Sequence, residues 1–229
     1  MTGEALPDVV LYDGNLVPPE AALVSAFDRG LLYGESLFET LKVVEGAPCL
    51  WPAHLKRLAA GCVELGLPLD LLSLEAGVHA LLEARPLAYG ALRIQVTGGT
   101  QPGGGRGMTA PAEGRRPRVI ATVTPLAAPA AAFYAAGVAV VTAGDLCRPL
   151  PWLKSGSYLA SIAAKARAEQ ANAFECLLLG GHPPVVLEGS FSSVLAWDGH
   201  GLVVPRPRGG CPGSPYKRWS RKRPPWGSS

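Results

Sequence analysis

Two sets of strand and helix patterns, divided by the alanine-rich segment 126–133, constrain the fold of this chain most strongly. Short apolar runs bounded by turn residues predict strands, whereas apolar residues spaced three and four apart predict helices. The first set predicts strands at 9–18, 37–51, 91–99 and 118–125 and helices at 52–67 and 71–84. The second set predicts a helix at 157–173 and strands at 137–143, 175–180, 184–190, 193–199 and 202–205. Glycine-rich segments predict loops at 27–36 and 100–117, and loops as long as the second are often functional.

This order of elements predicts an α+β fold in two domains, with 126–133 as the linker between them. We expect an N-terminal α/β domain over residues 1–125 and a C-terminal mixed domain over residues 126–205. A chain of 229 residues with 48% hydrophobic and 17% charged residues can bury a sizeable core in each.

Composition also bounds the compartment and the partners. No apolar run is long enough to span a bilayer, and the N-terminus lacks the basic and apolar regions of a signal peptide. Five cysteines without CxxC spacing predict reduced and mostly buried thiols, and four distant histidines form no ligand pattern. We therefore expect a cytoplasmic protein with no metal site and no membrane partner.

The last part of the chain differs from the rest in charge. Seven basic residues and no acidic ones follow Asp198; without these seven, 14 basic side chains stand against 18 acidic ones. Such a tail is typical of nucleic-acid or anionic-membrane binding. Residues 206–229 have no hydrophobic period and predict a disordered basic tail. We predict no nucleic-acid partner, because a different origin of this tail is suggested below.

Lys154 is the residue that most suggests chemistry. It follows Trp152 and Leu153 and precedes small residues, so apolar surface is expected beside it. Burial favours the neutral amine, which is the nucleophile that attacks a carbonyl. Glu188 ends an apolar strand pattern, where a carboxylate can accept a hydrogen bond from a protonated pyridine nitrogen. Without further support, the simpler interpretation of Lys154 is an ordinary exposed lysine where a loop meets a helix.

Four blocks make the chain resemble the fold-type IV (class IV) pyridoxal-phosphate enzymes over residues 8 to 205. In the family's order they are DRGLLYGESLFET (28–40), HLKRL (54–58), LKSGSYLASIAAKARAEQANAFECLLL (153–179) and LEGSFSSVLAWDG (187–199). The sequence departs from the family pattern at Glu35 for Asp, Ser36 for Gly, and Ser157 and Ser193 for Asn. The resemblance implies the two-domain class IV fold, pyridoxal 5'-phosphate, a small amino substrate and a homodimer.

The resemblance also implies roles for individual residues. Lys154 would form the Schiff base and act as the catalytic base and acid. Glu188 would be the partner of the pyridine nitrogen, and Arg57 would bind the cofactor phosphate. Three more residues would lie near the cofactor: Tyr158, Ser192 and Ser193. Without the resemblance, Arg57 could also be a solvated helix arginine and Tyr158 a core tyrosine. The turn that holds Ser192 and Ser193 could be a simple turn between strands.

Within the family, the motif FET at 38–40 and the short chain favour the lyase or D-amino-acid type over the branched-chain type. The loop at 98–107 resembles that of the 4-amino-4-deoxychorismate lyases, whose substrate is anionic. Arg93 and Arg106 are therefore candidate contacts for substrate carboxylates, although Arg106 could also be a solvated loop charge. The first expectation is this lyase, and the alternatives are a D-amino-acid or branched-chain aminotransferase and an inactive truncated product.

The C-terminal segment departs most from the family, which has a Pro-Gly-hydrophobic-Thr turn before a helix at this point. Codons for CPGSPYKRWSRKRPPW, read one base out of register, can give LPGVTVQAVVAEAAAV, which contains such a turn. The backbone N–H groups of the turn would bind phosphate at the helix N-terminus. We therefore interpret residues 206–229 as a possible frameshift product, and we expect weakened cofactor binding in the chain as written.

Overall fold

The computed structural model describes residues 7–104, 107–109, 113–206 and 217–222. Contacts between Cα atoms divide the chain into two units. Unit 1 contains Met1–Ala128 and Leu153–Gly156, and unit 2 contains Pro129–Trp152 and Ser157–Ser229. The short segment Leu153–Gly156 therefore belongs to the unit formed by the N-terminal half. The expected domain bounds, 1–125 and 126–205, remain a prediction.

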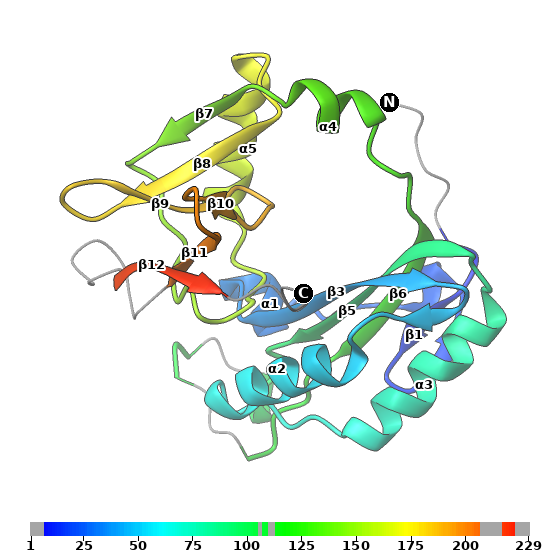
Figure 1. Ribbon diagram of the computed structural model, residues 1–229. Helices are drawn as coiled ribbons and strands as arrows, with labels where there is room; N and C mark the ends of the chain where they lie inside the picture. The colour runs from blue at the N-terminus through cyan, green and yellow to red at the C-terminus, as the bar shows by residue number, and fades with distance from the viewer. Residues whose placement is uncertain (1–6, 105–106, 110–112, 207–216, 223–229) are drawn as a thin grey trace. The chain divides into compact units, whose positions relative to one another are not determined.

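Six antiparallel strands form the sheet of unit 1, in the order β2-β1-β6-β5-β3-β4 (Figure 1). The strands are β1 (Val10–Tyr12), β2 (Asn15–Val17), β3 (Ser36–Val44), β4 (Ala47–Pro48), β5 (Tyr89–Thr97) and β6 (Val119–Pro125). β3 pairs with β5 along its whole length, from Ser36 opposite Thr97 to Val44 opposite Tyr89. On its other edge β4 pairs only with Val43 and Val44, so β4 leaves most of that edge uncovered.

Two helices, α2 (Trp51–Glu64) and α3 (Leu71–Ala84), cover one face of this sheet (Figure 1). Leu58 and Cys62 of α2 and Leu37 and Leu41 of β3 are buried in one core, as their spacing predicts. Each leucine buried in this way contributes about 1.5–3 kcal/mol. Asp70 caps α3, because its Oδ1 accepts hydrogen bonds from the second and third residues after it.

The segment 27–36 was expected to be a loop, and this prediction was wrong in part. It contains the short helix α1 (Arg29–Tyr33). Asp28 is its N-cap, and Gly34 ends it in the left-handed conformation, with φ 69°. The N-cap Asp28 and the C-cap Gly34 are only six residues apart, so the helix is little more than one turn long. So short a helix has no apolar period, and the glycines around it favoured the prediction of a loop. The 3-10 turns η1 (Pro19–Ala21) and η2 (Pro102–Gly104) complete the elements of unit 1.

The segment Leu153–Gly156 lies against the edge of β3 that β4 leaves uncovered. The N–H of Phe38 donates to the carbonyl oxygen of Lys154 at 2.9 Å, and the N–H of Gly156 donates to Ser36 at 2.8 Å. Leu153 is 5% exposed and belongs to the core of unit 1. The backbone around Lys154 is therefore held as a short antiparallel addition to the sheet.

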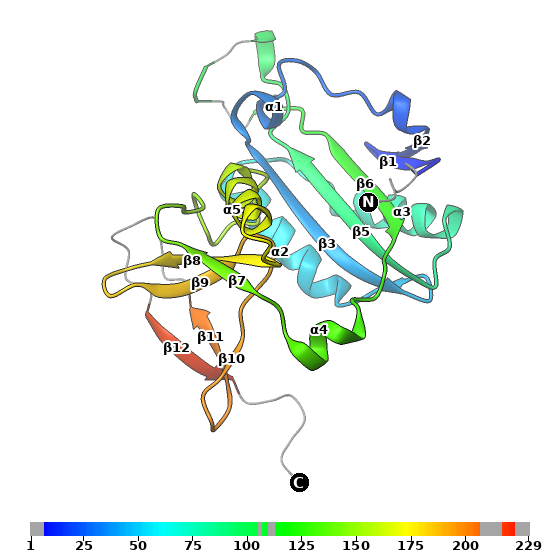
Figure 2. The ribbon, with the colours of Figure 1, turned by 90° about the horizontal axis from the view of Figure 1, so that it is seen from above.

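The described residues of unit 2 form two three-stranded sheets and two helices, and both sheets can be followed in Figure 2. One sheet has β7 (Val140–Ala143) parallel to β8 (Glu175–Gly180) and β8 antiparallel to β9 (Val185–Gly189). The other consists of β10 (Ala196–Trp197), β11 (Leu202–Arg206) and β12 (Lys217–Lys222). Helix α5 (Leu159–Gln170) packs Ala164 and Ala168 against β7 and β8. Alanine at these positions lets the helix approach the strands closely, since it adds little volume.

Three expectations for this half need correction. The helix expected at 157–173 is shorter at both ends: α5 begins after its N-cap Tyr158, and Asn172, with a left-handed φ of 52°, follows its C-terminal end. The linker expected at 126–133 includes the start of a helix, α4 (Ala131–Ala136). Residues 217–222 were expected to be disordered, yet they form β12 beside β11. Backbone pairing to an edge strand requires no hydrophobic period, so composition did not reveal it.

Among the described residues, no helix combines the length and the apolar character that a membrane crossing requires. The same part of the chain holds no group of three or more His, Cys, Asp or Glu side chains that could bind a metal ion.

Candidate active site

The side chain of Lys154 lies against an aromatic ring. Its Nζ is 4.5 Å from the centroid of the Phe38 ring, and Phe38 is 2% exposed. The guanidinium carbon of Arg93, on β5, lies 4.2 Å from the same centroid. Two cations thus contact one buried ring, and each gains a cation–π attraction. Of the residues singled out in the sequence, the structure brings together Lys154 and Arg93.

Arg57, the expected phosphate ligand, is bound by a buried carboxylate of β3. Its Nε and Nη2 each donate to a different oxygen of Glu39, both at 2.6 Å, and Glu39 is 1% exposed. The hydrogen bond from Arg57 to Glu39 raises the pKa of Arg57, against the opposing effect of burial. His54 Nδ1 lies 2.7 Å from the Glu39 Oε2 atom. Arg57 lies on a helix, as its sequence pattern predicts, whereas its partner Glu39 was not predicted.

Glu188 and Tyr158 both contact Arg148 in unit 2. Arg148 Nη1 donates to Glu188 Oε2 at 2.9 Å, and the two side chains are 14% and 28% exposed. The guanidinium carbon of Arg148 lies 5.6 Å from the centroid of the Tyr158 ring. The ion pair places the guanidinium of Arg148 directly against the carboxylate of Glu188. No signal in the sequence identified Arg148 as the residue that joins the other two.

The turn after β9 is organised by a second buried carboxylate, Glu175. It accepts hydrogen bonds from the Ser190 hydroxyl, from the Ser192 hydroxyl at 2.7 Å and from the N–H of Cys176 at 2.8 Å. Burial raises the pKa of Glu175, but these hydrogen bonds outweigh it and lower the pKa overall. The hydroxyl of Ser192 was expected at the cofactor, yet here it binds Glu175. Cofactor roles for Ser192 and its neighbour Ser193 remain predictions.

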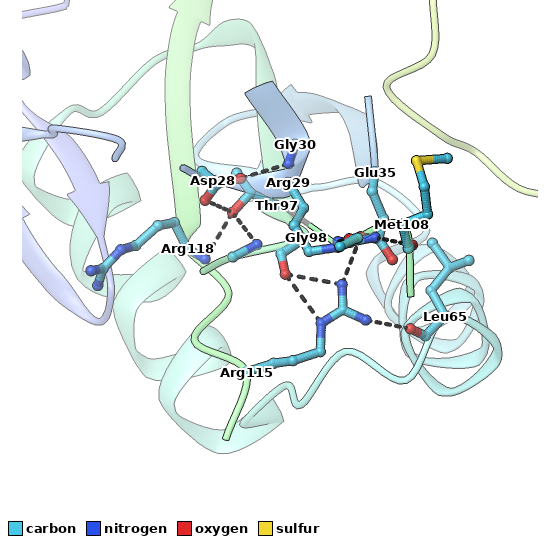
Figure 3. A network of polar contacts seen from close by, with 12 residues as sticks. Asp28, Arg29, Gly30, Glu35, Leu65, Thr97, Gly98, Met108, Arg115 and Arg118 are labelled. Atoms are coloured by element: carbon cyan, nitrogen blue, oxygen red, sulfur yellow. Dashed lines mark hydrogen bonds and ion pairs between the residues drawn. The ribbon is translucent and has the colours of Figure 1, made fainter. Parts of the chain in front are cut away.

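Asp28 and Thr97 connect the start of α1 to the end of β5 (Figure 3). Asp28 is 1% exposed; it accepts from the N–H of Gly30 at 2.7 Å and from the Thr97 hydroxyl at 2.6 Å. The hydroxyl oxygen of Thr97 accepts from the N–H groups of Gly99 and Arg118. These bonds fix both ends of the loop 100–117 to the sheet.

Arg29 and Glu35 extend this network toward the middle of the loop (Figure 3). Arg29 donates to the carbonyl oxygens of Gly107 and Met108, at 2.6 and 2.8 Å, and forms an ion pair with Glu35. Glu35 also lies 2.8 Å from Nη2 of Arg115, near the other end of the loop. Glu35, which replaces the family's usual aspartate, thus links two arginines that hold the same loop.

Arg106, the second candidate for substrate contact, lies outside the described residues. The loop borders a cavity of about 440 Å³. The cavity is lined by Thr100, Gln101, Pro102, Gly103, Gly114, Arg115 and Arg116. None of Lys154, Arg57 and Arg93 lines this cavity, so it does not coincide with the surroundings of the lysine.

The sequence and the structure were then compared with those of known proteins. The chain belongs to the class IV aminotransferase family, since the profile described as "Amino-transferase class IV" matches residues 36–213. The family and the relatives below are enzymes, as the sequence blocks indicated.

Relatives with different activities are similar to this chain. It is 37% identical to the solved 4-amino-4-deoxychorismate lyase of Pseudomonas aeruginosa, with a TM-score of 0.68, covering 86% of this chain and 70% of that one. The pyridoxal-phosphate-bound form of a hypothetical aminotransferase of Mycobacterium tuberculosis is 28% identical, with a TM-score of 0.69 and coverage of 86% and 71%. The D-alanine aminotransferase of Bacillus licheniformis is 28% identical over 190 residues, which is 81% of this chain but 64% of that protein. The chain therefore spans somewhat less than two thirds of this curated relative.

Proposed function

We propose that this chain is a pyridoxal-phosphate-dependent 4-amino-4-deoxychorismate lyase, which converts 4-amino-4-deoxychorismate to pyruvate and 4-aminobenzoate, the latter for folate biosynthesis. The observation that carries the chemistry is the position of Lys154, whose backbone is fixed to β3 and whose ammonium lies 4.5 Å from the centroid of the buried Phe38 ring. The sequence identity of 37% to the lyase of Pseudomonas aeruginosa supports the lyase over the other activities of the family.

The polar groups of three described residues suit the binding of pyridoxal phosphate. Arg57 is a guanidinium held by Glu39 and 52% exposed, which suits a phosphate ligand. Glu188 is a carboxylate paired with Arg148, which suits the acceptor of a ring N–H. Lys154 is a primary amine beside an apolar ring, which suits a carbonyl group. In this proposal Arg57, Glu188 and Lys154 would hold the cofactor, with Tyr158 near its ring.

When bound, pyridoxal phosphate supplies an aldehyde for amino groups and a ring that withdraws electrons from the neighbouring carbon. Lys154 Nζ would accept a proton from the substrate carbon that carries the amino group and, in the lyase reaction, donate it to the leaving enolpyruvate as the C–O bond to the ring breaks. Glu188, which forms an ion pair with Arg148, would accept a hydrogen bond from the protonated ring nitrogen. Arg93 shares the Phe38 ring with Lys154, so it would orient a substrate carboxylate beside the base. Arg106 would add a second cation for the same anionic substrate.

An aminotransferase acting on D-amino acids is the second candidate, favoured by the similarity to the D-alanine aminotransferase of Bacillus licheniformis. The residues named above would serve either reaction, since both begin with a proton moved by the lysine. We also propose a cytoplasmic homodimer, which the family resemblance and the expected compartment support. An inactive product remains the third reading, because the segment from residue 206 departs from the family.

The test measures 4-aminobenzoate formed from 4-amino-4-deoxychorismate by the purified chain with pyridoxal phosphate. Lyase activity requires 4-aminobenzoate without any added 2-oxo acid. An aminotransferase would instead consume 2-oxoglutarate in the presence of D-alanine and form no 4-aminobenzoate. Activity in neither assay, for this chain and for a version whose C-terminal reading frame is restored, would overturn the proposed function.

A further inference from the structure

We propose that Glu39 is a positioning residue, which holds the Arg57 guanidinium so that its remaining donors face a phosphate group. This inference rests on the proposed function, because it assigns Arg57 to the cofactor phosphate. It adds a residue, Glu39, that none of the sequence arguments singled out.

Glu39 is a charged residue in an apolar environment. It lies in β3 between Leu37 and Leu41, which belong to the core that α2 covers, and it is 1% exposed. A carboxylate in such a place is unfavourable unless charged partners compensate it. His54 and Arg57, three residues apart on α2, reach the carboxylate from the same face of the helix.

The contact between Glu39 and Arg57 has the parallel geometry that fixes a guanidinium in its own plane. Nε and Nη2 donate to the two oxygens at equal distances of 2.6 Å. Neither of these bonds uses Nη1, and the Arg57 side chain is 52% exposed. A guanidinium carries five N–H donors in a rigid fork. A carboxylate bound by Nε and Nη2 therefore leaves the donors at the Nη1 end for a second anion. Glu39 therefore determines the direction in which that second edge points.

His54 limits the movement of the carboxylate itself. Its Nδ1 lies 2.7 Å from Oε2, the oxygen that also accepts from Arg57 Nη2. Oε2 is thus held by two groups and Oε1 by one. Because Glu39 cannot turn without losing one of these contacts, the guanidinium that it holds is fixed as well.

A simple stabilising ion pair would predict something different. Loss of Glu39 would then weaken the binding of every ligand alike, because the fold as a whole would be destabilised. A positioning role predicts a selective loss, confined to ligands that carry a phosphate. Pyridoxal, which lacks the phosphate, and pyridoxal phosphate are therefore the two probes that separate the explanations.

The experiment compares the purified full chain with its Glu39→Gln, Glu39→Asp and Arg57→Lys variants and the double variant Glu39→Gln/Arg57→Lys. The dissociation constants of pyridoxal phosphate and pyridoxal are measured by absorbance titration, and borohydride reduction shows whether either is bound to Lys154. Glu45→Gln is the matched control, since Glu45 is an exposed turn residue next to β3. Circular dichroism shows which variants fold, and Glu39→Asp keeps the charge if Glu39→Gln does not fold.

We expect Glu39→Gln to weaken pyridoxal phosphate about tenfold and pyridoxal less than twofold, with a smaller effect of the same kind in Glu39→Asp. In the Arg57→Lys background the Glu39→Gln change should add little, because both act through one contact. Equal weakening of both probes, or additive effects in the double variant, would overturn the inference. If neither the unchanged chain nor its frame-restored version gives an adduct at Lys154, the proposed function fails. In that case the role of Glu39 is tested separately, by measuring the affinity for inorganic phosphate with calorimetry. The inference requires this affinity to fall in Glu39→Gln and to stay unchanged in Glu45→Gln.

Discussion

The N–H of Phe38 donates a 2.9 Å hydrogen bond to the carbonyl oxygen of Lys154, and the ring of Phe38 contacts the ammonium of the same lysine. Phe38 therefore holds both the backbone and the side chain of Lys154. Glu39, the next residue in β3, points to the other face and binds Arg57. Two consecutive strand residues thus hold Lys154 and Arg57, the two residues of unit 1 that are proposed to bind the cofactor.

Replacing Arg148 should reveal how strongly the Glu188 carboxylate depends on it. Arg148→Gln removes the guanidinium from a partly buried carboxylate, so we expect a loss of about 1–3 kcal/mol in the free energy of unfolding. Urea denaturation measures this loss. Arg167→Gln is the control, because the ion pair of Arg167 with Asp145 is exposed and should matter little. A larger effect of Arg167→Gln than of Arg148→Gln would contradict this account of Glu188.

Glu175 should contribute stability that depends on pH. Its pKa is lowered in the folded state, so its contribution is complete above the ordinary carboxyl range near pH 4.5. It is lost as the pH falls through the lower folded pKa, when the carboxylate is protonated. Glu175→Gln places an amide donor against the hydroxyl and N–H donors, and should cost about 1–3 kcal/mol at pH 7.

The measurement for Glu175 is the free energy of unfolding of both proteins from pH 7 down to pH 3. The difference between them should shrink as the pH falls. A difference that stays constant over this range would show that the charge of Glu175 plays no part.

The fold was predictable where the sequence pattern is local. The helix at 71–84 and the strand at 175–180 match α3 and β8 residue for residue, because Asp70 and the flanking turns mark their ends. The addition of Leu153–Gly156 to β3 was not predictable. It pairs residues more than 110 positions apart through backbone groups, and backbone pairing leaves no side-chain pattern in so short a segment.

The candidate site shows the same division. Lys154 and Glu188 could be proposed because their residue types and neighbours point to chemistry. Glu39 had one signal, a carboxylate between two leucines in a strand that buries them. Arg148 had none, because its partner is 40 residues away and only the fold brings the two side chains together.

The cysteines should differ in their reactivity. Burial raises the pKa of Cys62 to about 12 and also raises the pKa of Cys176. At pH 8 both thiols therefore stay protonated, and the thiolate is the reactive form. Cys49 and Cys147 are only partly buried. Among these four cysteines, maleimide labelling followed by peptide mapping should modify Cys49 and Cys147 before Cys62 and Cys176 in the folded chain, and all four at similar rates in urea. Early labelling of Cys62 would contradict the burial described here.

The reading frame of the gene offers an independent test of the C-terminal segment. If residues from about Pro205 to Cys211 contain a frameshift, genomic DNA should encode a Pro-Gly-hydrophobic-Thr turn in a neighbouring frame. The restored chain should bind pyridoxal phosphate more tightly than the chain as written, since the turn supplies N–H donors to the phosphate. Resequencing that finds no such turn in any frame would remove the hypothesis.

The most direct test of the central claim is to treat the purified chain with pyridoxal phosphate and borohydride and to map the modified peptide by mass spectrometry. The account predicts a reduced pyridoxyl group on Lys154 in the chain or in its frame-restored version, and none after Lys154→Arg. The Lys154→Arg variant should still fold, because the bonds that hold residue 154 to β3 are made by the backbone. Modification spread over exposed lysines, with Lys154 unmodified in both versions, would contradict the assignment.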